Sequence, residues 1–126
     1  MKKLFLLLPF FLLNACHSNS DTLRGNSYQF EINETPVLIS FDKKDNRYYG
    51  KVVNNYFGSY SKDGNNITLH EGGATMMMGP KTKMLAEQEW FKLIPQISSF
   101  EQTQNGIIFT LKNGKKLTLQ KTKTSH

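Results

Sequence analysis

The sequence predicts an α+β fold in which a curved antiparallel sheet, partly open and barrel-like, has one helix packed on it. Several short segments alternate apolar and polar residues with a period of two, as half-buried strands do. Turn residues such as Asn-Gly separate some of these segments. One stretch between two prolines carries good helix formers instead. Strands, one helix and more strands along the chain favour a sheet that the helix closes at one side or end.

The first group of predicted strands follows the N-terminal region. Its segments are residues 27–32, 37–42, 48–60 and 66–70. Gly50 and Gly58 mark places where a bend or a bulge is expected. Lys62-Asp63-Gly64 forms a turn before the last of these segments. The residues expected to share the apolar face within each segment include Tyr28, Phe30, Ile32, Val37, Ile39, Phe41, Ile67 and Leu69.

The predicted helix covers residues 80–94. Pro80 suits a first helical turn, and Pro95 suits a stop. At helical spacing one broad apolar stripe, which also includes Gln88, is formed by Met84, Leu85, Trp90, Phe91 and Ile94.

Two Asn-Gly pairs predict hairpin turns in the last part of the chain. Asn105-Gly106 and Asn113-Gly114 favour two-residue turns in which both positions need positive φ. The pairs enclose a strand over residues 107–112. They also precede a strand over residues 115–121, which alternates apolar and polar residues.

The chain opens with a charged start and the ten apolar residues 4–13. This run is too short to cross a bilayer, which needs about 20 apolar residues, and it has the proportions of a secretory signal. Leu13-Asn14-Ala15-Cys16 resembles the lipobox of bacterial lipoproteins. The resemblance implies cleavage before Cys16, a diacylglycerol on its sulfur and acylation of the new amino group. A plain signal peptide with a chance cysteine is the alternative.

The same resemblance predicts the compartment. In enteric bacteria an Asp directly after the lipidated cysteine retains lipoproteins in the inner membrane. This chain has His17 there, which favours the outer membrane, with the domain facing the periplasm. Cys16 is the one cysteine of the sequence, so its lipidation leaves a folded part without a thiol. The net charge of +6 does not make nucleic acid an expected partner of an exported protein.

Three segments carry short motifs in a fixed order: glycines with an asparagine and a Gly-x-Tyr, then an Ala-Thr-x-Met run, then a helix with a bulky pair that ends before a proline. The matching residues are Gly50, Asn55, Gly58 and Tyr60, then Ala74, Thr75 and Met77, then Met84, Glu87, Trp90, Phe91, Ile94 and Pro95. Together these segments resemble the HslJ/META-domain family of bacterial envelope proteins.

The resemblance implies a division of the chain. Its parts are a lipoprotein signal peptide (1–15), a lipidated polar tether (16–24), a META/HslJ-like domain (25–122) and a C-terminal tail (123–126). Where family members have cysteines in the first two signatures, a disulfide can join them. This chain has Asn54 and Gly79 or its neighbours there, and packing is expected to replace that link.

The residue types argue against catalysis and metal binding. A hydrolase needs a nucleophile, a base and an orienting group, and His70 is the one histidine inside the predicted domain. We therefore expect no enzyme, no cofactor and no zinc site, and no small-molecule substrate is evident. Met76, Met77 and Met78 raise the possibility of a Cu(I) site, because thioethers favour that ion. Core packing is the favoured interpretation of these methionines.

The family resemblance implies a non-enzymatic binding or structural module associated with stress or drug tolerance, with an envelope protein as a possible partner. The alternative is a pilotin-like chaperone that binds a hydrophobic tail of an outer-membrane protein. Phe41, Tyr56, Phe57 and Trp90 are the predicted lining of a hydrophobic groove. An open cavity lined by them favours the tail binder, and a filled core favours a scaffold with a surface site. Inhibition of host lysozyme is disfavoured because both proteins are basic.

Overall fold

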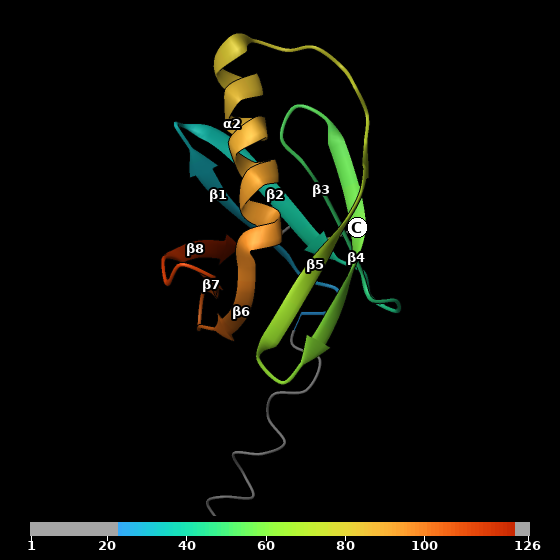
Figure 1. Ribbon diagram of the computed structural model, residues 1–126, viewed down its shortest axis with the longest axis vertical. Coiled ribbons are helices and arrows are strands. Elements are labelled where there is room, and N and C mark those ends of the chain that lie inside the picture. The colour runs from blue at the N-terminus through green and yellow to red at the C-terminus, as the bar shows by residue number, and fades with distance from the viewer. Residues whose placement is uncertain (1–22, 123–126) are drawn as a thin grey trace, which may run out of the picture.

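Eight strands follow one another in chain order around a closed barrel in residues 23–122, the part of the chain that the computed structural model describes (Figure 1). Neighbouring strands are antiparallel, and β8 pairs with β1 to close the ring. The predicted α+β fold is confirmed. The strands are β1 (Ser27–Ile32), β2 (Thr35–Phe41), β3 (Arg47–Lys51), β4 (Asn55–Asp63), β5 (Asn66–Ala74), β6 (Ile97–Gln102), β7 (Gly106–Leu111) and β8 (Lys116–Lys121).

Inward-facing side chains fill the barrel, because alternate residues of each strand point to the same side. Phe41 contacts two other rings of this core, with its ring centroid 6.2 Å from that of Tyr28 and 5.4 Å from that of Tyr60, both edge to face. Leu23, which the sequence placed in the tether, is also buried in this core. The interior is therefore a packed core.

Two hairpins lie beside the Asn-Gly pairs of the sequence, but their backbone conformations differ from those expected. Gly114 has the expected positive φ, whereas Asn105, Gly106 and Asn113 do not. Gly106 lies in β7, where a Cβ atom would come within 1.9 Å of the Leu119 carbonyl oxygen. The two-residue turn with positive φ at both positions joins β1 to β2, at Asn33 and Glu34. The Asn-Gly rule therefore located the hairpins and missed the close approach that Gly106 permits.

The helix α2 (Lys81–Leu93) and the 3-10 turn η2 (Ile94–Gln96) connect β5 to β6. In Figure 1 the connection from β5 arches over the top of the barrel, and α2 descends in front of β1 and β2. Trp90 packs edge to face on Phe30, with 5.5 Å between ring centroids. The buried face of α2 includes Ala86 and Glu87. Leu85 is half exposed, so its predicted place in the inward stripe was wrong.

The seam between β5 and β6 is where the barrel is least complete. Within residues 23–122 these strands pair at a single position, Asn66 with Ser99. Beyond Asn66 the edge of β5 that does not pair with β4 diverges from β6. The end of α2 and η2 lie beside this edge (Figure 1). This seam positions the candidate site.

Candidate functional site

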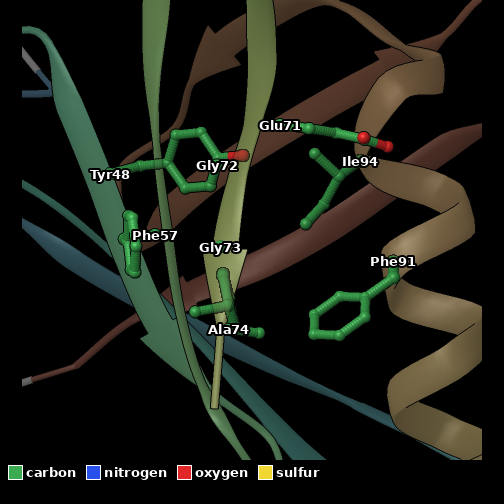
Figure 2. Close-up of a pocket in the computed structure, with 9 residues that line it drawn as sticks. Tyr48, Phe57, Glu71, Gly72, Gly73, Ala74, Phe91 and Ile94 are labelled. Carbon is green, nitrogen blue, oxygen red and sulfur yellow. The ribbon is translucent and has the colours of Figure 1, made fainter. Parts of the chain in front are cut away.

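A shallow groove of about 260 Å³ occupies the seam between β5 and α2. Figure 2 shows the edge of β5 on one side of it and Phe91 and Ile94 of the helical segment on the other. We call it the β5–α2 groove. It is lined by Tyr48, Tyr56, Phe57, Glu71, Gly72, Gly73, Ala74, Phe91 and Ile94.

Two tyrosines form the floor of the groove, and each crosses a glycine on the neighbouring strand. Tyr56 pairs with Gly50, and its hydroxyl donates a 2.5 Å hydrogen bond to the Leu38 carbonyl oxygen one strand further on. A Cβ atom at Gly50 would lie 2.4 Å from that hydroxyl and 2.0 Å from that carbonyl oxygen. Gly50 is therefore required by the path of the Tyr56 ring, and no register shift occurs there.

Tyr48 and Gly58 repeat this arrangement within the same pair of strands, with the tyrosine now on β3 and the glycine on β4. Tyr48 pairs with Gly58, and its hydroxyl donates a 2.8 Å hydrogen bond to the His70 carbonyl oxygen. The register of β4 and β5 shifts between Phe57 and Ser59. The bulge expected at Gly58 is therefore confirmed.

Burial in the floor of the groove raises the pKa of both tyrosine hydroxyls. Burial raises the pKa of Tyr48 to about 12, and the negative charge of Glu71 adds to this effect. Burial also raises the pKa of Tyr56. The Trp90 indole nitrogen lies beside the Tyr56 hydroxyl, without the geometry of a hydrogen bond. Both phenols are therefore neutral hydrogen-bond donors at neutral pH.

The structure brings two of the four predicted groove residues together. Tyr56 and Phe57 line the β5–α2 groove, and Phe57 is 55% exposed. Phe41 and Trp90 do not line it, because they point into the filled barrel and are at most 1% exposed. Their assignment to a groove was wrong, since a closed ring turns its inward aromatic residues into core.

Sequence reasoning missed the helix side of the groove and the end of β5. Phe91 was assigned to the apolar stripe, and the segment 71–74 was not assigned to any site. The adjacent glycines Gly72 and Gly73 were an available signal, because glycine within a strand often marks a bulge or a close approach. A Cβ atom at Gly72 would come within 2.1 Å of the Phe57 carbonyl oxygen.

A polar network joins the β3–β4 turn and the connection after β5 to the middle of α2. Asn54 donates a 2.9 Å side-chain hydrogen bond to Glu87 and a 3.2 Å one to the Met77 carbonyl oxygen. Its side-chain oxygen accepts bonds from the Met77 amide (2.5 Å) and the Thr75 hydroxyl (2.9 Å). Glu87 also accepts bonds from the amides of Val53 (3.0 Å) and Asn54 (2.6 Å). Hydrogen bonds, and not packing alone, thus join the two segments where a disulfide was expected in relatives.

The family model of the META domain matches residues 17–124. The chain belongs to the META domain family. In this META domain the first signature has a physical basis, because Gly50 and Gly58 make room for the rings of Tyr56 and Tyr48. The second signature carries Thr75, which bonds to Asn54, and the third carries the buried Glu87 and Trp90.

Two solved structures resemble this META domain. The NMR structure of a protein from Burkholderia xenovorans has a TM-score of 0.67 and 15% sequence identity, and the match covers 86% of this chain and 98% of that one. The crystal structure of a DUF4847 family protein from Bacteroides vulgatus has a TM-score of 0.52 and 14% identity, over 71% of this chain and 60% of that one. At these identities the likeness concerns the fold alone. No curated protein matches the chain significantly.

The methionines of the second signature are not in the core. Met76, Met77 and Met78 are 90%, 54% and 86% exposed. They follow the end of β5 in the connection to α2, where Asn54 holds the backbone of Met77. Core packing was therefore the wrong prediction, because no strand places these side chains against the barrel.

Within residues 23–122 no three His, Cys, Asp or Glu side chains gather in a way that suits a metal ion. His70 Nε2 lies 2.9 Å from the Ser61 hydroxyl on the exposed surface of β4 and β5, outside the groove. The helices of the described part are too short or too polar to cross a bilayer. Cys16, the predicted lipidation site, lies outside the described residues.

Proposed function

We propose that this META domain is the folded part of a non-enzymatic envelope lipoprotein, which Cys16 anchors to the outer membrane and which binds a partner protein at the β5–α2 groove. The groove is the observation that carries the proposal. It joins exposed aromatic surface to an incompletely paired strand. Grooves with apolar walls and few polar groups are typical binding sites.

Because the interior of the barrel is filled, we place the partner in the surface groove. The largest core side chains, among them Trp90 and Phe41, occupy the barrel that an open pilotin-like fold would leave for a tail. A volume of about 260 Å³ suits a few side chains of a partner. The second candidate, a chaperone for the hydrophobic tail of an outer-membrane protein, therefore also uses the groove, with Phe57 and Phe91 as its apolar contacts.

The location and the role are part of the same proposal. The lipobox-like residues 13–16 support a lipid anchor, and two or more acyl chains make such an anchor stable. His17 supports the outer membrane, with the domain in the periplasm. A role in tolerance of stress or drugs follows from the family resemblance.

Metabolic labelling with palmitate tests the anchor. The Cys16→Ser variant is expected to lose the label and to keep its leader, while the domain stays folded. Palmitate that persists in this variant would refute the lipid anchor.

Site-specific photo-crosslinking in intact envelopes tests the groove. A photoreactive residue at position 57 is expected to give a discrete crosslinked protein, because Phe57 is exposed at the groove wall. Leu85 is the control, since it is also apolar and exposed but lies outside the lining residues. Equal crosslinking patterns from positions 57 and 85 would overturn the assignment of the groove.

A further inference from the structure

We propose that the β5–α2 groove takes an extended segment of the partner, which pairs with β5 as an added strand and places a basic side chain beside Glu71. This inference rests on the proposed function and names the chemistry of its partner.

The first argument is the free edge of β5. In the described part of the chain this edge has a strand partner at Asn66 and none from Glu71 to Ala74. The groove is lined by inward-facing Ala74 and by outward-facing Gly73, which pair with Tyr56 and Phe57 of β4. Because the groove contacts residues on both faces of β5, it extends around the edge of that strand. From Glu71 to Ala74 the edge of β5 therefore borders the groove, where an extended chain can pair with it.

The second argument is the shape of the walls. The Phe57 ring covers Gly73, where it would lie 2.9 Å from a Cβ atom. Gly72 and Gly73 themselves add no side chain to the edge. An added strand lies about 4.8 Å from its neighbour, which places it between β5 and the helical residues Phe91 and Ile94 (Figure 2). Its alternate side chains then meet aromatic and aliphatic walls.

The third argument is charge. Glu71 is exposed and is the single charged residue among those described that line the groove, in a chain with a net charge of +6. Figure 2 shows its side chain extending from β5 toward Ile94 across the opening. An Arg or Lys of the partner can pair with this carboxylate and lay its alkyl stem on the aromatic wall. A neutral apolar segment leaves the carboxylate without a partner.

The test uses the full lipidated chain in nanodiscs of neutral phosphatidylcholine, which do not themselves attract basic peptides. The probe is a pool of random peptides about seven residues long, close to an average strand. Peptides retained by the wild type are sequenced and compared with those retained by Glu71→Gln. Glu101→Gln is the matched control, because it removes one exposed strand carboxylate outside the groove.

We expect the wild type and Glu101→Gln to retain peptides enriched in Arg and Lys, and Glu71→Gln to lose that enrichment. For one enriched peptide, Glu71→Gln is expected to weaken binding roughly two- to fivefold, as for an exposed ion pair. N-methylation at alternate backbone positions should abolish binding in one register and leave it intact in the other. Equal enrichment in both Glu variants, or equal effects of the two N-methylation registers, would overturn the proposal.

Ala74→Trp separates this inference from the proposed function, because its ring fills the groove, and its melting curve shows whether it folds. If Ala74→Trp loses binding of peptides that show no enrichment in Arg or Lys, the groove is the binding site but its occupant is not a basic strand. That result would refute this inference and leave the proposed function standing. Peptides that bind folded Ala74→Trp as well as the wild type would refute the groove itself. Retention of no peptide by the wild type would count against both.

Discussion

The side chain of Asn54 donates a 2.9 Å hydrogen bond to the carboxylate of Glu87, and so joins the β3–β4 turn to the middle of α2. Both residues are almost completely buried, at 4% exposure. Buried polar groups stabilise a fold when their partners are all present and are costly when one partner is removed. This network also holds Met77, and with it the connection that leads from the groove to the helix.

We expect Asn54→Ala to destabilise the domain by about 2–4 kcal/mol, because the Met77 amide and one oxygen of Glu87 each lose a buried partner. Urea unfolding measures the change. Asn55→Ala is the control, since Asn55 is exposed and the hydrogen bonds found for it use its backbone. Equal losses in the two variants would show that the network does not stabilise the fold.

Gly58→Ala is expected to destabilise by more than about 3 kcal/mol or to prevent folding, because its Cβ atom would lie 2.3 Å from the His70 carbonyl oxygen and 2.6 Å from the Tyr48 hydroxyl. Gly64→Ala is the matched comparison. It has open space around it but a φ of +65°, so it should cost about 1–2 kcal/mol. Thermal unfolding of both variants shows whether the steric contact at position 58 costs more stability than the strained backbone at position 64.

Stability is expected to fall at alkaline pH through the groove tyrosines. Burial raises the pKa of Tyr48 to about 12, so the folded protein holds this proton more tightly than the unfolded chain, whose tyrosines titrate near pH 10. The stabilising contribution is therefore complete below about pH 10 and is lost as the pH rises through about 12.

Urea unfolding between pH 9 and pH 12 measures this loss. Tyr48→Phe is expected to show a smaller decline than the wild type, because the titrating phenol is gone. Tyr49→Phe, which removes an exposed tyrosine from the same strand, is expected to retain the wild-type slope. If the free energy of unfolding of Tyr48→Phe declines as steeply with pH as that of the wild type, the alkaline loss of stability does not come from the Tyr48 hydroxyl.

Trp90→Ala is expected to cost about 3–5 kcal/mol, because the ring is fully buried and packs on Phe30. Leu85→Ala on the same helix should change stability by less than about 0.5 kcal/mol, since half of that side chain is exposed. Denaturation curves of the two variants measure the difference. Similar losses would mean that α2 packs through a different face.

The α+β arrangement followed from local pattern, because alternation of residues such as Val37, Ile39 and Phe41 reflects one buried face of a strand wherever that strand lies. The helix between Pro80 and Pro95 followed from backbone chemistry, since proline starts or stops a helix without any tertiary contact. The turns near Gly106 and Gly114 were located for the same local reason.

The site depended on contacts between segments far apart in the chain. Closure of the ring put Phe41 inside, although the same alternation fits the wall of an open groove. The edge of β5 became accessible because β6 diverges from it after Asn66, and pairing between distant strands leaves no periodic signal in either one. The partner of Asn54, Glu87, lies 33 residues away, and spatial closeness at that separation arises only from packing of the whole domain.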